Sequence, residues 1–72
     1  STNVSVLLKE PLHIKVAVYS IDWIEMEILV DNELPIGRSS FVVRATNYGS
    51  GEYFLLAEGG GYQQVRKIML IK

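Results

Sequence analysis

The stretch His13-Ile14-Lys15-Val16-Ala17-Val18-Tyr19 decides the fold, because its alternation of side chains is the cleanest in the chain. Successive side chains of a β-strand point to opposite faces of the sheet, so a period of two predicts an extended strand. The residues expected to face the core are Ile14, Val16 and Val18. The residues expected on the opposite face are His13, Lys15 and Ala17.

Similar segments lie on both sides of this strand. Valine, isoleucine and aromatic residues are frequent throughout the chain, and these residue types favour strands. Further strands are expected at residues 4–8, 23–30, 39–46, 52–58 and 65–71, with residues 33–37 as at best an edge strand. A spacing of roughly 8–12 residues without a long helical insert is typical of a sandwich or small barrel. The sequence therefore predicts one all-β domain over residues 1–72, with about six to seven antiparallel strands.

The segment 23–30 has two interpretations. As a strand it is followed by a hairpin turn at Asp31-Asn32, which is the interpretation we favour. In that register the inward residues are Ile24, Met26, Ile28 and Val30, and the outward residues are Trp23, Glu25, Glu27 and Leu29. As a helix it would begin at Asp22, with Glu25 completing a capping-box-like start.

The composition excludes several classes of protein. The 72 residues contain no cysteine, which excludes disulfides, thiol catalysis and cysteine-ligated metals. The net charge of −1 argues against a general nucleic-acid binder, and no apolar run is long enough for a membrane span. The first residues are polar and lack a signal-peptide pattern, so we expect a targeting segment to be absent or already removed.

Two parts of the chain resemble a known family. The stretch Trp23-Ile24-Glu25-Met26-Glu27-Ile28-Leu29-Val30-Asp31-Asn32 resembles a hairpin of bacterial immunoglobulin-like modules. Gly51-Glu52-Tyr53-Phe54-Leu55-Leu56-Ala57-Glu58, with the glycine turn and Val65-Arg66-Lys67-Ile68, resembles their closing hairpin. The C-terminal domains of some bifunctional penicillin-binding proteins share this layout. The resemblance implies an immunoglobulin-like sandwich, a spacer, adhesion or docking role, an extracytoplasmic or cell-envelope location and no catalytic residues.

The residues offer little catalytic chemistry. His13 is the only histidine, and a solvated or edge position explains it, so no catalytic residue, metal site or cofactor is expected. On a regular strand Glu25 and Glu27 point the same way, about 7 Å apart. Such a pair suits acid–base chemistry or cation binding, but a solvated strand face is the commoner explanation. An enzyme or enzyme inhibitor with a loop-borne site at residues 47–51 stays a further hypothesis.

Surplus apolar residues give the main functional hypothesis. With Tyr53, Leu55 and Ala57 facing inward, the neighbouring residues Phe54 and Leu56 must point outward, as must Val42 in its segment. An apolar outer face suggests a docking module that binds a protein partner or a second copy of itself. The alternative is a carbohydrate or small-ligand binder that uses Trp23 and neighbouring tyrosines. The candidate binding residues are Trp23, Leu29, Tyr48, Phe54, Leu56 and Tyr62.

Overall fold

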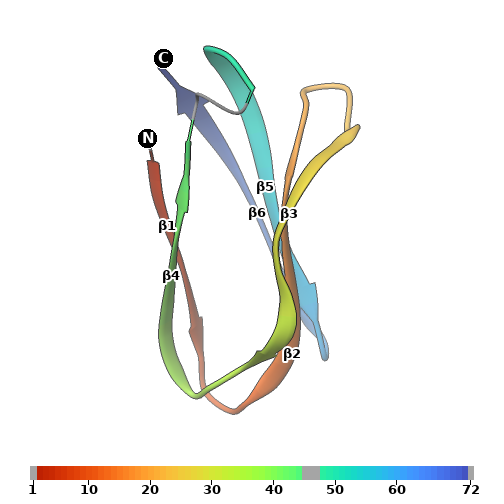
Figure 1. The fold of residues 1–72 in the computed structure, drawn as a ribbon. Coiled ribbons are helices and arrows are strands. Elements are labelled where there is room, and N and C mark those ends of the chain that lie inside the picture. Colours follow the sequence, from red (N-terminus) through yellow and green to blue (C-terminus); the bar gives the residue numbers. More distant parts are fainter. Residues whose placement is uncertain (1, 45–47, 72) are drawn as a thin grey trace.

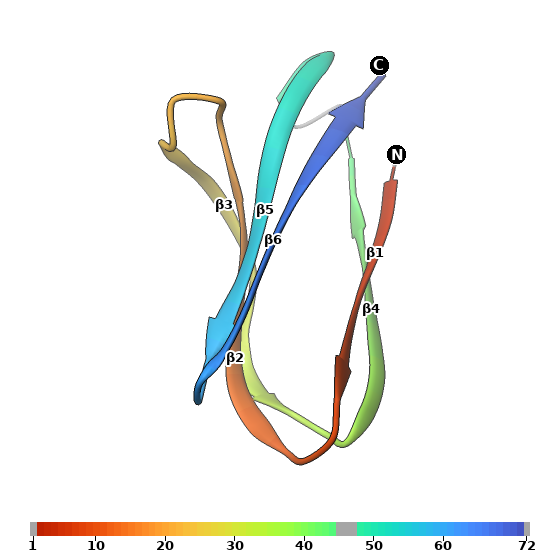
Figure 2. The ribbon, with the colours of Figure 1, turned by 180° about the vertical axis from the view of Figure 1, so that it is seen from behind.

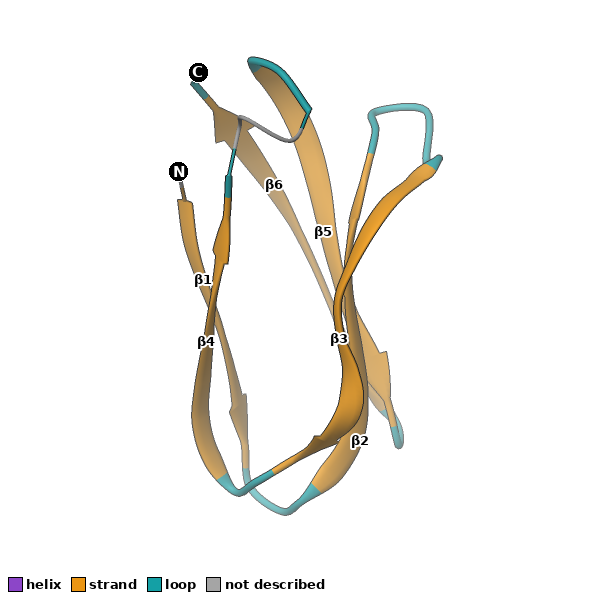
Figure 3. Cartoon of the chain, in the orientation of Figure 1, coloured by secondary structure: helices purple, strands orange, loops and turns teal. Residues whose placement is uncertain are grey.

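A computed structural model describes residues 2–44 and 48–71. These residues form six strands and no helix (Figure 3), which confirms the all-β prediction. No helix in the described ranges is therefore long and apolar enough to cross a membrane. The strands are β1 (Thr2–Leu8), β2 (Leu12–Tyr19), β3 (Glu25–Leu34), β4 (Gly37–Val43), β5 (Gly51–Gly59) and β6 (Tyr62–Leu70).

The strands form a sandwich of two antiparallel sheets (Figure 1). One sheet contains β1 and β4, and the other has the order β3-β2-β5-β6. The chain crosses between the sheets after β1 and after β3, at the end of the molecule opposite to both termini. At the terminal end β6 approaches β1 (Figure 2), where the Thr2 hydroxyl donates to the Met69 carbonyl oxygen at 3.4 Å.

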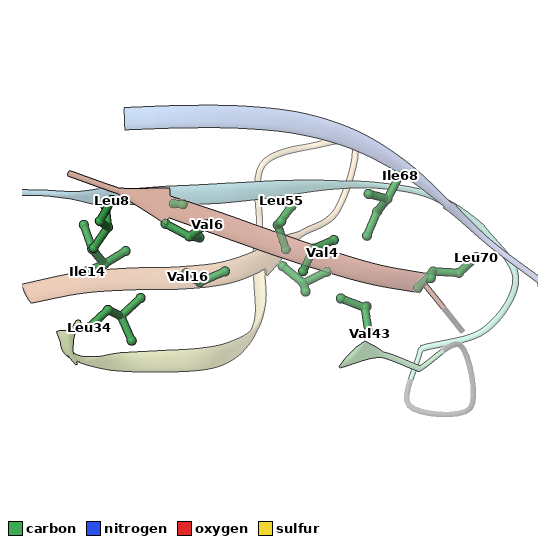
Figure 4. Packing of buried hydrophobic residues seen from close by; sticks show 12 residues of the cluster. Val4, Val6, Leu8, Ile14, Val16, Leu34, Val43, Leu55, Ile68 and Leu70 are labelled. Carbon is green, nitrogen blue, oxygen red and sulfur yellow. The ribbon is translucent and has the colours of Figure 1, made fainter. Parts of the chain in front are cut away.

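The core lies between the two sheets (Figure 4) and follows the period-two pattern of β2. Ile14, Val16 and Val18 are completely buried, as predicted. Leu55 and Ala57 of β5 join them from the same sheet, and the facing sheet supplies its own apolar residues. The core residues of that facing sheet are Val4, Val6, Leu8 and Val43. Burial of each large side chain is worth about 1.5–3 kcal/mol, so this layer dominates the stability.

Strand β3 departs from the prediction in its length and its faces. It continues through the expected turn at Asp31-Asn32 and ends at Leu34, which is buried in the core, so the predicted turn was wrong. Two bulges interrupt its pairing with β2 and leave Leu29 and Met26 without partners in that strand. Each extra residue reverses the inward–outward alternation.

Several residues of the segment 24–30 do not have their predicted faces. Three residues expected in the core are exposed instead: Met26 and Ile28 because of the bulges, and Ile24 because it lies in the turn before β3. Leu29, expected to face outward, packs against the core together with Val30. The segment is extended from Glu25, so the helical alternative was wrong.

Strand β4 keeps its predicted faces in the described part. Phe41 packs against the core, Val43 is buried and Val42 is exposed. The last residues of the expected segment, 45 and 46, lie outside the described residues, as does residue 47.

Candidate functional site

The four-stranded sheet has an outer face, turned away from β1 and β4, that is organised in rows. Directly paired residues on neighbouring strands share a face of the sheet, so the register defines which side chains lie side by side. Across β3, β2, β5 and β6, the central row contains Ile28, Ala17, Leu56 and Val65. The aromatic row contains Glu25, Tyr19, Phe54 and Lys67. The charged row contains Asp31, Lys15, Glu58 and Gln63.

The central row is apolar from edge to edge. Ala17 is completely buried although it lies outside the core cluster, because larger neighbours on its own face cover it. Leu56 is half-buried, whereas Ile28 and Val65 are 45% and 49% exposed. No strand of the described residues packs on this face, since β1 and β4 lie on the other side of the core. The exposed apolar surface of the row is thus supplied by Ile28, Leu56 and Val65, whereas Ala17 is covered.

The turn between β2 and β3 places a tryptophan beside this face. The Ser20 amide donates to the Ile24 carbonyl oxygen at 2.9 Å, and the Trp23 amide donates to the Ser20 carbonyl oxygen at 2.9 Å. The Ser20 hydroxyl also accepts hydrogen bonds from the amides of Asp22 and Ile24, each at 3.2 Å. Trp23 has a φ of 63°, in the left-handed position of a three-residue hairpin loop where glycine or asparagine is usual.

Aromatic stacking holds Trp23 over the sheet. Its ring lies parallel to Phe54, with 4.5 Å between the centroids, and tilted against Tyr19 at 5.7 Å. The left-handed backbone costs roughly 1–2 kcal/mol for a residue with a Cβ. An aromatic pair returns about 0.5–1.5 kcal/mol beyond the area that it buries. Stacking therefore offsets the strain, yet half of the Trp23 side chain remains exposed.

Two substitutions of Trp23 distinguish the stability gained from ring stacking from the cost of the left-handed backbone conformation. Trp23→Gly and Trp23→Ala both remove the stack on Phe54, but only alanine keeps the steric cost of the left-handed conformation. We expect the glycine variant to be more stable than the alanine variant by about 1 kcal/mol, measured by urea unfolding. Equal free energies of unfolding would contradict the left-handed assignment.

An ion pair crosses the central row at Ala17 and joins the charged row to the aromatic row. Lys15 Nζ lies 2.8 Å from Glu25 Oε1, and the Tyr19 hydroxyl donates to the same carboxylate oxygen at 3.2 Å. The hydrogen bond from Lys15 lowers the pKa of Glu25, and the same bond raises the pKa of Lys15. Burial, followed by the bond to Glu25, raises the pKa of Tyr19. The group therefore favours ionised Glu25 and Lys15 with neutral Tyr19.

These pKa shifts predict how stability depends on pH. The contribution of Glu25 is present above its ordinary pKa and is lost as the pH falls through its lowered folded value. The contributions of Lys15 and Tyr19 are present below their ordinary pKa values and are lost as the pH rises through their raised folded values. Urea midpoints across an acid series should fall less steeply for Glu25→Gln than for the unaltered chain. Parallel curves would contradict the assigned role of Glu25.

Several predicted site residues lie elsewhere. Glu25 and Glu27 point to opposite faces because Met26 forms a bulge between them, so the expected carboxylate pair does not exist. The Tyr48 hydroxyl donates to Glu27, and the Tyr48 ring lies 5.5 Å from that of Tyr53. The structure thus places Glu27 and Tyr48 away from the cluster of Trp23 and Phe54.

The remaining polar candidates have local partners. The Tyr62 hydroxyl donates to Gln64 Oε1 at 2.7 Å next to the β5–β6 turn. His13 is exposed, and its Nε2 lies 2.7 Å from Asp31 Oδ1. Within residues 2–44 and 48–71, no three histidine, aspartate or glutamate side chains gather as a cation site.

Of the predicted binding residues, the outer face brings together Trp23, Phe54 and Leu56. The other three predicted binding residues are partly buried and pack against the core, namely Leu29, Tyr48 and Tyr62. Sequence reasoning missed the roles of Ile28 and Val65 as the two ends of the central row. The alternation of residues 65–71 alone could have placed Val65, whereas Ile28 depends on a bulge that has no clear sequence signal.

Comparison with known proteins finds no matching family model, no matching curated protein and no matching solved structure.

Proposed function

We propose that this domain is a non-catalytic interaction module that docks on a protein through the outer face of its four-stranded sheet. One observation carries the proposal: the central row is apolar across all four strands on the side away from the core. Isolated exposed apolar residues are common on proteins, but contiguous ones mark interaction sites.

The residue types at this face suit binding. Tryptophan and tyrosine are enriched among the residues that dominate interface energies, and Trp23 and Tyr19 adjoin the central row. Charged side chains adjoin the exposed apolar residues, since the Lys15–Glu25 pair lies across Ala17 and the Lys67–Glu52 pair lies beyond Val65 and Leu56, as polar groups do around the apolar part of a protein interface. Residues that are stacked and half-exposed in the free domain lose little side-chain freedom on docking.

The resemblance to bacterial immunoglobulin-like modules is part of this proposal. Modules of that family serve as spacers, adhesion domains or docking domains, which agrees with an open sheet face. Through the resemblance, the proposal also places the chain outside the cytoplasm or in the cell envelope.

A double substitution tests the docking role. Phe54→Thr with Leu56→Thr removes two apolar side chains from the outer face while keeping residues that suit strands. We expect sedimentation, alone and with an extract of the source cells, to show association of the unaltered chain and its loss in the variant. The matched control is Val42→Thr with Leu7→Thr, which alters two exposed residues of the other sheet. Identical behaviour of the unaltered chain and both variants would overturn the proposal.

A second candidate function rests on Trp23 alone. A half-exposed tryptophan ring at the edge of a sheet can stack on a sugar ring, and the Trp23 ring is already held by Phe54. Because Trp23 is the only tryptophan, its fluorescence reports directly on this site. A saturable change with one glycan of a panel would favour a carbohydrate binder, and unchanged emission across the panel would remove this candidate.

A further inference from the structure

We propose that copies of this chain associate head to tail, with the free edge of β6 in one copy paired to the free edge of β3 in the next. This contact uses the edges of the four-stranded sheet and not its outer face, so it goes beyond the proposed function. The two strands end the sheet on opposite sides, β3 nearer the viewer in Figure 1 and β6 in Figure 2. Backbone groups on the free side of an edge strand are those that pair with an added strand.

The strand directions let the sheet continue from copy to copy. Each neighbouring pair in the order β3-β2-β5-β6 is antiparallel, so β6 runs opposite to β3. When a second copy lies beside the first in the same orientation, β6 therefore meets the β3 of that copy as an antiparallel partner. In the described part of the chain, the two-stranded sheet of β1 and β4 pairs with neither edge.

The two edges carry opposite charges. Both strands are described in full, and β3 contains no lysine or arginine whereas β6 contains no carboxylate. The charged residues are Glu25, Glu27, Asp31 and Glu33 in β3, and Arg66 and Lys67 in β6. Pairing β3 with β3, or β6 with β6, would bring like charges together, which opposes association. The charge pattern therefore selects the pairing of β6 with β3.

One pair of charges selects the register. On the core-facing side of the sheet, one row runs from Glu27 through the buried strands to Arg66. Within the fully described β3 and β6, Glu27 is the only carboxylate on that side and Arg66 is the only cation. Placing Arg66 opposite Glu27 of the next copy also places Val65 opposite Ile28, because the antiparallel register is the same. Both of these apolar residues are half-exposed in the free chain.

Both charges are available to a second copy. Arg66 is exposed and forms no ion pair with a described residue. Glu27 is half-buried and accepts a hydrogen bond from the Tyr48 hydroxyl at Oε1. Its Oε2 has no partner among the described residues, and a carboxylate accepts hydrogen bonds at both oxygens. An arginine from the next copy therefore adds to the contact with Tyr48 without displacing it.

The other charges of the two edges play no part in the contact. Lys67 is paired with Glu52, and Glu25 is paired with Lys15, each within its own chain. Bulges at Met26 and Leu29 bend β3 and limit the new pairing to the short stretch around Glu27 and Ile28. We therefore expect association at high protein concentration. Because the two paired surfaces differ, each copy keeps one free edge of each kind and association continues beyond a dimer.

Reciprocal charge reversal tests the contact by sedimentation. The unaltered chain should form species larger than a dimer as its concentration rises to about 1 mM. Arg66→Glu and Glu27→Arg each oppose like charges across the contact, so either variant alone should remain a monomer. An equimolar mixture should assemble again, since every contact between the two variants joins opposite charges. The matched controls are Lys9→Glu and Glu10→Arg, which make the same changes at exposed positions of the β1–β2 turn and should assemble like the unaltered chain.

Four results would overturn the edge contact: a monomer at every concentration, assembly that stops at a dimer, equal assembly of all variants, or a mixture of folded variants that stays monomeric. Folding is checked by far-UV circular dichroism. Should Glu27→Arg unfold, Glu27→Gln takes its place; a rise in the concentration needed for assembly would support the contact, and no change would overturn it.

The outer face is tested separately. The docking test with Phe54→Thr and Leu56→Thr belongs at dilutions where the edges do not associate, and this double variant should still assemble at high concentration. If assembly is lost in that variant but kept in Arg66→Glu, the edge contact is overturned and the proposed function stands. If assembly follows Arg66 and Glu27 while no binding depends on Phe54 and Leu56, the proposed function is overturned and the edge contact stands.

Discussion

Val16→Asp is expected to unfold the domain, and Lys15→Asp is expected to leave it folded. Val16 is completely buried at the centre of β2, between two strands of the larger sheet. An unpaired carboxylate at that position costs several kcal/mol of free energy of unfolding. A domain of this size is stable by only about 4–11 kcal/mol, so the loss is comparable to its whole stability.

The neighbouring residue provides the matched control. Lys15 lies on the outer face and forms an ion pair with Glu25. Lys15→Asp therefore removes a surface contact and leaves the packing of the core unchanged. Far-UV circular dichroism with thermal melting distinguishes the two variants. Equal tolerance of aspartate at the two positions would mean that the register of β2 is wrong.

Gly59→Ala is expected to have the second-largest effect. Gly59 ends β5 with a φ of 149°, and a Cβ at this position would overlap the carbonyl oxygen of His13. It would also lie 3.2 Å from the Cα atom of Ile14. These are backbone atoms of the central strand, so relief requires β2 and β5 to separate next to the core. We expect a loss of several kcal/mol in urea unfolding, as for other overpacked positions.

Gly61→Ala isolates the clash from the conformational cost. Gly61 also has a positive φ, of 85°, but nothing lies within 4 Å of its Cβ position. Its substitution should cost only the strain of a left-handed residue, about 1–2 kcal/mol. If the two alanine variants lose the same free energy of unfolding, the close approach of Gly59 to β2 is contradicted.

The sequence predicted the central strands well because their residues obey period two without interruption. Inward Ile14, Val16 and Val18 follow from the alternation alone, and so do Leu55 and Ala57. The position of Phe54 and Leu56 on the outer face follows from the same rule. Strand order and the division into two and four strands were not predictable, because they depend on long-range pairing.

The faces and the end of strand β3 were not predicted correctly, for two physical reasons. Its bulges at Met26 and Leu29 shift the register by one residue each, and ordinary apolar residues occupy both positions. Asp31 and Asn32 favour a turn locally, but the strand continues because this conformation buries the Leu34 side chain in the core. The actual turn contains Trp23 in a conformation that usually signals glycine, so no turn motif marked it.

The most direct test of the docking face compares neighbouring leucines of β5. Leu55 is 6% exposed in the core, whereas Leu56 lies on the outer face. The measurement is the free energy of unfolding of Leu56→Thr and Leu55→Thr, at a dilution where the chain is a monomer. The docking account predicts a large loss, about 2–5 kcal/mol, for Leu55→Thr and a much smaller loss for Leu56→Thr. Equal losses, or unfolding of Leu56→Thr, would show that Leu56 belongs to the structural core and would contradict the docking face.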